Sequence, residues 1–416
     1  MKRFFHKLSL FLLVFVFSLC FYPVSEAAET VKIGMPIPLS GPMGNVGLSV
    51  TRGIKYAIAE IQNQGGFLGK KVDLLIRDDT GKADMTMRVA RELVTKDKVN
   101  YLVGAVGSAT SLALSQVGKE RRVLTIVHAK SDKLTVQGFH RYGFAMYPST
   151  HAEGQQAALI AARHLLKGID KPRIFYLAYD YEYGHAIWNA FRPRIKELKP
   201  GAEFVGEAWT RIGETDFTAA ITAILAKKPD MVLNSIWAGG IIGFLKQAKP
   251  YDLFDKTKFL CTAEGVAVDY CRALGRDMPE GIWGNAFDVF YWPDNPVHIK
   301  YIKGITKMFN IEDPGNYALP TYLDVHMLNL AVQKAGTLKT EAVVNALEEI
   351  KIDSPFGGKV YFRKCDHQSN YGAVWGVTKK DPRYPYLILD QLEHVPASAG
   401  WYSCDEAREL RAKASK

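Results

Sequence analysis

The sequence has few cysteines for its length and far fewer glycines than a collagen needs, and these shortages exclude several classes of protein. Only five of its 416 residues are cysteine, too few for a disulfide-stapled miniprotein, and 35 glycines are too few for a collagen. With 48% hydrophobic residues, the chain is also unlike a disordered one. We therefore expect a globular protein whose length suits two or three domains, each with its own core.

Clustered charge is missing as well. The chain carries 53 basic and 43 acidic residues, a net charge of +10, but no run of five basic residues occurs. A nucleic-acid-binding surface needs its basic residues gathered in a patch or stripe. We interpret the excess as favouring solubility and predict no nucleic-acid partner.

Catalytic and metal-binding motifs are absent from the sequence. It contains no H-E-x-x-H, no G-x-S-x-G, no phosphate-binding P-loop and no C-x-x-C. Its ten histidines are dispersed, with no pair at the spacing of metal ligands on a helix. We predict no metal, no cofactor and no enzyme activity, and an extracytoplasmic hydrolase is the least favoured alternative.

Residues 1–27 have the pattern of a secretory signal peptide. Three basic residues precede an apolar run of 15 residues from 8 to 22, and an A-x-A-like site follows before Ala28. The run is short for a hydrocarbon layer of about 30 Å, although a retained signal anchor is the alternative. Leu19 is bulkier than the small residue that lipid attachment at Cys20 prefers, so no lipid anchor is expected. We predict a periplasmic protein.

Four cysteines would remain after cleavage, in an oxidising compartment that favours disulfides. Three pairings are possible. Proximity along the chain favours two bonds, one joining Cys261 with Cys271 and the other joining Cys365 with Cys404.

Short apolar runs alternate with helical periods along the rest of the chain. We predict strands at 31–39, 71–79, 101–108, 122–129, 173–179, 231–236 and 258–262, with a glycine-rich turn at 41–47 and helices between the strands. This alternation predicts an α/β fold with two parallel-sheet units that restart after Pro148. Ligands bind such folds where strands end, so a cleft is expected between the units.

Several separated segments carry a family resemblance. VKIGMPIPLSGPMGNVG, YLVGAVGSATSLALS, EYGHA, EGVA and PTYLDV lie in order along the chain. Together they resemble the periplasmic binding proteins of branched-chain amino-acid ABC transporters, the type I periplasmic binding proteins. The resemblance implies two Rossmann-like lobes joined by three hinge crossings, near Pro148, residues 285–288 and residues 354–359. It assigns residues 30–148 plus 288–355 to one lobe and 149–287 plus 356–416 to the other.

The resemblance also implies a set of ligand-binding residues. Ser108 matches the serine that holds a ligand carboxylate, with a helix N-cap as its alternative role. Glu264 matches the anchor of the ligand ammonium, with a structural salt bridge as its alternative. Aromatic walls correspond to Tyr183, Trp237 and Tyr317, each of which could instead be core packing.

Position 130 departs from the family pattern, as does Val46, which replaces an aromatic residue common after S-G-P. Lys130 stands where the family usually has a hydroxyl residue, with Ser131 beside it. A lysine there could pair with a ligand carboxylate or fill space in the pocket. We therefore expect either a small, hydrophobic or branched-chain amino acid or, as the alternative, an aromatic acid, another carboxylic acid or an amide.

The resemblance implies transport as the function. The protein is expected to be a monomer that closes on a small-molecule ligand and delivers it to the membrane subunits of an ABC permease. A ligand-sensing module for a signalling partner uses the same fold and is the other alternative.

Overall fold

The computed structural model describes residues 30–414. The predicted signal peptide at 1–27 lies outside this range. Within the described range, no helix is long and apolar enough to cross a membrane.

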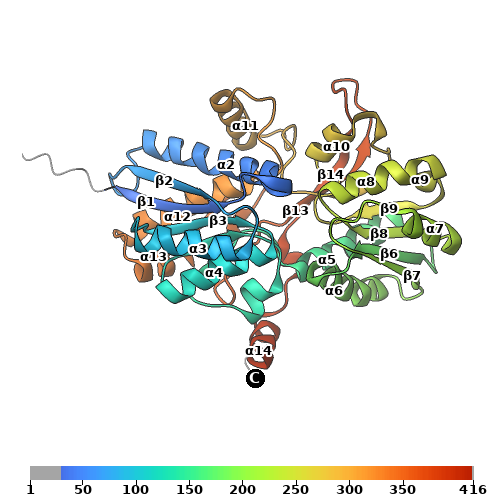
Figure 1. The fold of residues 1–416 in the computed structure, drawn as a ribbon, viewed down its shortest axis with the longest axis horizontal. Coiled ribbons are helices and arrows are strands. Elements are labelled where there is room, and N and C mark those ends of the chain that lie inside the picture. Colours follow the sequence, from blue (N-terminus) through green and yellow to red (C-terminus); the bar gives the residue numbers. More distant parts are fainter. Residues whose placement is uncertain (1–29, 415–416) are drawn as a thin grey trace, which may run out of the picture.

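The first lobe is built on five parallel strands in the order β2-β1-β3-β4-β5 (Figure 1). Helices cover both faces of this sheet, so central strands such as β3 are buried along their whole length. The strands are β1 (Val31–Ile37), β2 (Val72–Asp78), β3 (Tyr101–Val106), β4 (Thr125–His128) and β5 (Gly143–Ala145). Helices α3 (Ala83–Thr95) and α4 (Ser108–Arg121) cover one face, and α2 (Gly44–Asn63), α12 (Ala318–Ala335) and α13 (Thr340–Leu347) cover the other.

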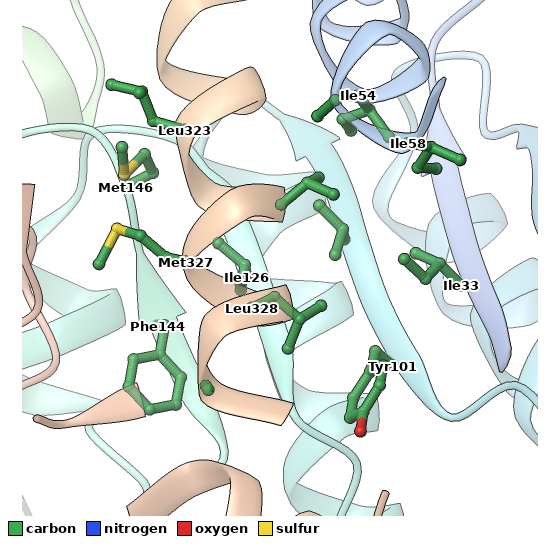
Figure 2. Close-up of a cluster of buried hydrophobic side chains, with 14 of the residues drawn as sticks. Ile33, Ile54, Ile58, Tyr101, Ile126, Phe144, Met146, Leu323, Met327 and Leu328 are labelled. Atoms are coloured by element: carbon green, nitrogen blue, oxygen red, sulfur yellow. The ribbon is translucent and has the colours of Figure 1, made fainter. Parts of the chain in front are cut away.

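Helix α12 closes the core of this lobe although it follows the sheet by more than 170 residues. Figure 2 shows Leu323, Met327 and Leu328 of α12 beside Ile126 of β4 and Phe144 of β5. All five side chains are at most 5% exposed. Burial of such apolar side chains is worth about 1.5 to 3 kcal/mol each, which is why a distant helix joins this sheet.

The second lobe is built on a seven-stranded sheet in the order β14-β13-β10-β9-β8-β6-β7. Five strands are parallel, and the last two in the chain add antiparallel at one edge. The strands are β6 (Arg173–Tyr179), β7 (Glu203–Thr210), β8 (Met231–Ser235), β9 (Lys258–Cys261), β10 (Trp283–Ala286), β13 (Ala373–Lys379) and β14 (Ile388–Val395). Their order β7-β6-β8-β9-β10 repeats the order of the first sheet.

Alternation along β6 explains how both faces of this sheet are filled. Ile174 and Tyr176 pack with helices on one face, whereas Phe175 and Leu177 pack with helices on the other. Helices α5 (Thr150–Ile160) and α6 (Glu182–Leu198) cover the first face, and α7 (Thr218–Lys227), α8 (Gly239–Ala248), α9 (Leu253–Lys256) and α10 (Val268–Leu274) belong to the second.

The chain passes between the lobes between β5 and α5, after β10, and before β13. The lobe boundaries drawn from sequence stay predictions. Val360 and Tyr371 pack in the core of the first lobe, whereas Ala373 packs in the second. This packing favours a third crossing near residue 372, later than residues 354–359. Between the second and third crossings, in addition to α12 and α13, lie α11 (Pro296–Phe309), β11 (Lys351–Asp353) and β12 (Lys359–Tyr361).

The last helix, α14 (Cys404–Ala414), lies against the first lobe. A disulfide joins Cys404 to Cys365, with an S–S distance of 2.04 Å. Arg411 of the same helix donates from Nε to the carbonyl of Val136 at 3.1 Å. The sequence had assigned residues 356–416 to the second lobe, and these contacts favour placing α14 with the first.

The predicted bond between Cys261 and Cys271 is wrong, because both thiols are free and buried. The Cys261 Sγ lies 3.6 Å from the amide of Asn234, and the Cys271 thiol donates to the carbonyl of Val266 at 3.3 Å. Each sulfur therefore has its own neighbour within the second lobe. Burial raises the pKa of both thiols to about 12, so both stay protonated.

The glycine-rich turn predicted at 41–47 is also wrong in its second half. A short 3-10 turn covers Gly41–Met43, and α2 already begins at Gly44. Gly47 is a helical residue, and a Cβ there would lie 1.8 Å from the carbonyl oxygen of Pro38. A glycine is therefore required at position 47, because α2 packs closely against the end of β1 there.

Candidate functional site

Most of the residues predicted to bind a ligand lie just beyond the carboxyl ends of parallel strands. Ser108 follows β3, Lys130 and Ser131 follow β4, and Glu264 follows β9. Carboxyl ends of parallel strands meet at one edge of a sheet, where open α/β folds bind ligands. The two sheets place these edges opposite each other, so the side chains meet between the lobes.

Lys130 forms the centre of the site. Its Nζ lies 2.6 Å from Oε1 of Glu153 and also forms a short ion pair with Oε1 of Glu264. The three side chains are 7%, 0% and 7% exposed, in the order Lys130, Glu153, Glu264. Lys130 comes from the first lobe, whereas Glu153 lies in α5 and Glu264 in the loop after β9. The ion pairs therefore cross from one lobe to the other.

Polar groups of the second lobe hold the two carboxylates in place. The side-chain amide of Asn285 donates to Oε1 of Glu153 at 2.8 Å and to Oε1 of Glu264 at 3.3 Å. The backbone N–H of Glu264 in turn donates to Oδ1 of Asn285 at 3.0 Å. Asn285 therefore fixes both acids relative to each other and to the end of β10.

The loop that carries Glu264 has unusual backbone geometry. Ala263 and Glu264 have φ values of 57° and 58°, in the left-handed region that side chains other than glycine seldom adopt. The N–H of Ala263 donates to Oε1 of Glu153 at 3.0 Å. Such conformations persist where surrounding bonds hold them and are frequent at functional sites.

Tyrosines complete the hydrogen bonds of the acids. The hydroxyl of Tyr183 donates to Oε2 of Glu153 at 2.8 Å, and that of Tyr317 donates to Oε2 of Glu264 at 3.3 Å. Both carboxylates thus accept bonds on each oxygen, which offsets part of the cost of burying them.

The ammonium of Lys130 lies against one aromatic ring, which packs on two others. Its Nζ lies 5.0 Å from the centre of the Phe287 ring, close enough for a cation–π interaction. Tyr147 stacks on Phe287 with ring centres 4.2 Å apart, and Tyr317 packs on the same ring at 5.7 Å. The hydroxyl of Tyr147 is buried and has no hydrogen-bond partner within residues 30–414. The site therefore holds one polar atom whose bonding capacity is unused.

The charges of the cluster do not balance when all three groups are ionised. Two carboxylates face one ammonium, which leaves one negative charge in a buried place. Burial and the neighbouring Glu153 raise the pKa of Glu264 to about 7, although Lys130 opposes this. Burial alone would lower the pKa of Lys130, but Glu153 and Glu264 raise it above its usual value. Lys130 is thus a cation at neutral pH, and Glu264 takes up a proton readily.

Two other predicted residues, Ser131 and Trp237, make contacts outside the Lys130 cluster. The Ser131 hydroxyl donates to Glu182 at 3.0 Å, and Lys133 pairs with the same carboxylate at 3.1 Å. Trp237 is half-buried, and its ring N–H donates to the hydroxyl of Tyr181 at 2.7 Å. The Ser131 and Lys133 contacts cross from the first lobe to the second, whereas the Trp237 contact lies within the second lobe.

Ser108 is the first residue of α4 and does not cap it. The N-cap is Gly107, whose φ of 90° suits glycine. The Ser108 hydroxyl donates to the carbonyl of Lys130 at 3.2 Å. Ser108 therefore contacts the backbone of the central lysine and lies where the positive end of a helix dipole begins.

Sequence reasoning missed four residues of this cluster, namely Glu153, Asn285, Phe287 and Tyr147. An acid in the first turn of a helix is ordinarily favoured by the dipole, so Glu153 gave no signal of a cleft role. Asn285 fell inside the hinge crossing expected at 285–288, and the short strand that positions it, β10, was not predicted. Across the described range, no group of three or more His, Cys, Asp or Glu residues has the geometry to hold a metal ion.

Comparison with known proteins adds independent information. A family model described as periplasmic binding protein matches residues 30–379. The Leu/Ile/Val-binding protein BraC3 of Rhizobium johnstonii is 30% identical over 353 residues, which cover 83% of this chain and 90% of that protein.

Two solved structures show the same fold at lower identity. A leucine binding protein from Thermotoga maritima aligns with a TM-score of 0.74 at 19% identity, covering 88% of this chain and 99% of that one. An ABC transporter solute binding protein from Rhodopseudomonas palustris, in complex with 3,4-dihydroxybenzoic acid, aligns with a TM-score of 0.76 at 21% identity, covering 88% and 97%. The predicted α/β fold of two lobes is thereby confirmed.

Proposed function

This chain belongs to the periplasmic binding protein family, and from that membership we propose that it captures a small α-amino acid with a hydrophobic side chain between its lobes. The protein is a solute-binding component of an ABC transporter system and not an enzyme. The proposal has three further parts. The signal peptide at 1–27 directs export to the periplasm, the lobes close about the hinge on the ligand, and the closed protein delivers the ligand to the membrane subunits.

The observation that carries the amino-acid assignment is the excess of buried negative charge. Glu153 and Glu264 together outnumber the single ammonium of Lys130. A ligand that brings an ammonium would balance the cluster, because a buried carboxylate is costly unless it is paired. The rings of Phe287 and Tyr317 offer the apolar surface that a hydrophobic side chain needs.

The ligand carboxylate has a separate place in this proposal. Ser108 belongs to the first lobe, at the start of α4, where the helix dipole favours an anion. Its hydroxyl would leave the carbonyl of Lys130 to donate to the ligand carboxylate. Similarity to proteins named for leucine, isoleucine and valine supports the same ligand class.

A carboxylic acid without an amine is the second candidate, with Lys130, Ser108 and Ser131 as its expected contacts. The presence of Lys130 in the site and the aromatic acid bound by the Rhodopseudomonas palustris structure support it. Such a ligand would meet a lysine already shared by two carboxylates. It would add a negative charge where one is already in excess, so the charge balance favours the amino acid.

A thermal-shift experiment with matched probes tests the assignment. The probes are L-leucine, 4-methylpentanoate, which lacks the ammonium, 3-methylbutylamine, which lacks the carboxylate, and 4-hydroxybenzoate. A ligand at 100 times its dissociation constant adds about 2.7 kcal/mol of stability. We expect L-leucine to give the largest shift. Shifts confined to the two amine-free acids would contradict the amino-acid assignment and support the second candidate.

A further inference from the structure

We propose that Lys130 is a tethered occupant of the ammonium site, which holds the two lobes together without ligand and must give up Glu264 when an amino acid binds. This inference rests on the proposed function for the identity of the competing ligand. Its other half concerns the ligand-free protein alone. There the ion pairs of Lys130 with Glu153 and Glu264 join the two lobes, and we call these ion pairs the clasp.

The position of the charges supports the clasp. Lys130 belongs to the first lobe, and both of its acidic partners belong to the second. An open cleft would separate the ammonium from both carboxylates and return them to water. In the closed arrangement the three groups are desolvated, so their mutual attraction acts in a medium of low dielectric constant. The ammonium is therefore what allows the acids to be buried without a ligand.

The hydrogen bonds indicate which partner Lys130 keeps. Glu153 is fully buried and accepts three further bonds, from Ala263, Asn285 and Tyr183. Glu264 accepts only two, both longer at 3.3 Å, from Asn285 and Tyr317. Glu264 therefore has fewer and longer hydrogen bonds than Glu153, so it is the acid that Lys130 leaves. A ligand ammonium on Glu264, with Lys130 remaining on Glu153, gives each of the two buried acids its own cation, while the ligand carboxylate lies at Ser108.

This exchange makes Lys130 a specificity-determining residue. A ligand without an ammonium cannot replace the lysine on Glu264, so it leaves the clasp unchanged and gains nothing from it. A ligand with an ammonium replaces one ion pair by another and also fills the cleft. The apparent affinity is then lowered by the fraction of protein in which Lys130 already occupies the site.

The chain offers a matched control three residues away. Lys133 pairs with Glu182 across the same two lobes, but its side chain is 56% exposed and that of Glu182 is 33% exposed. Exposed ion pairs are worth little, because water and salt screen them. The pair of Lys130 with Glu153 and the pair of Lys133 with Glu182 therefore differ mainly in burial.

The test compares the wild type with two double variants, Lys130→Met/Glu153→Gln and Lys133→Met/Glu182→Gln. Each removes one cation and one anion, so net charge is unchanged. Small-angle scattering of the ligand-free proteins measures the radius of gyration. We expect a larger radius only for the first variant. Equal radii in the wild type and the first variant would overturn the clasp.

Calorimetry with L-leucine then measures the competition. If Lys130 occupies the site in about 70% or more of the ligand-free protein, its removal tightens binding threefold or more. Unchanged or weaker binding by a folded Lys130→Met/Glu153→Gln protein would overturn the competition. Should no variant bind L-leucine while the radius still increases, the amino-acid assignment fails and the clasp stands.

Discussion

Glu264 is the residue whose replacement separates the candidate ligands most sharply. Glu264→Gln keeps the size of the side chain and an oxygen for the hydroxyl of Tyr317, but it removes the negative charge. If the ligand ammonium binds there, the variant leaves that ammonium desolvated and without its counter-charge. The position is 5% exposed, so water cannot replace the lost partner.

The expected loss follows from this burial. Removing one partner of a buried, hydrogen-bonded charge pair costs about 2 to 5 kcal/mol of binding free energy. At about 1.4 kcal/mol for each factor of ten, L-leucine should bind about 30 to 4,000 times more weakly to Glu264→Gln than to the wild type. Glu182→Gln, in the same lobe but with a side chain that is 33% exposed, should change the affinity less than threefold.

The affinity of the wild type should also depend on pH. Burial and Glu153 raise the pKa of Glu264 to about 7, and a ligand ammonium requires the ionised form. Binding therefore strengthens as pH rises through 7, and it should be about tenfold weaker at pH 6 than at pH 8. Lys130, Tyr183 and Tyr317 have pKa values above their usual range and do not titrate in this window. The Glu264→Gln variant should lose the dependence.

Isothermal titration calorimetry of the three proteins at pH 6, 7 and 8 measures both effects. An affinity of Glu264→Gln within threefold of the wild type, or stronger than it, would refute the placement of an ammonium on Glu264. A flat pH profile for the wild type would refute the titration of that carboxyl on binding. Circular dichroism of each variant establishes that it is folded.

Two further predictions concern the scaffold. Denatured, unreduced protein lacking residues 1–27 should contain two free thiols, Cys261 and Cys271, and thiol titration that finds four would contradict the Cys365–Cys404 bond. Leu328→Ala should lower the free energy of unfolding by about 2 to 5 kcal/mol, since Leu328 is fully buried between α12 and the first sheet. Leu330→Ala, 43% exposed on the same helix, should stay within about 0.5 kcal/mol in urea denaturation, and equal losses would contradict the packing of α12.

Local pattern was sufficient for much of the fold. The strand predicted at 173–179 matches β6, and most other apolar runs match strands to within a few residues. Such runs are fully buried between helix layers, so their hydrophobicity is continuous and easily recognised. The strands β5, β10 and β14 were missed. The strand β5 has only three residues, and the four residues of β10 include Gly284 and Asn285, which interrupt the apolar pattern. The strand β14 carries polar residues along its length because it lies at the edge of the sheet.

The sequence by itself determined which edge of each sheet carries the candidate site residues. A polar or charged residue directly after a parallel strand lies at the carboxyl end of that strand, however the helices pack. This holds for Ser108, Lys130 and Glu264. It also left the four cysteines with a choice of partners, which distance along the chain did not resolve. Cys261 and Cys271 are ten residues apart and unbonded, whereas Cys365 and Cys404 are bonded across 39.

Only the tertiary structure decided what Lys130 contacts. Glu153 lies on a helix of the other lobe, Glu264 on a distant loop and Asn285 at the end of a short strand. Nothing in their spacing brings them together, because their approach depends on how two separately folded sheets face each other. Buried charges interact strongly only within a few ångströms, so the pairing of this lysine is a property of the assembled lobes.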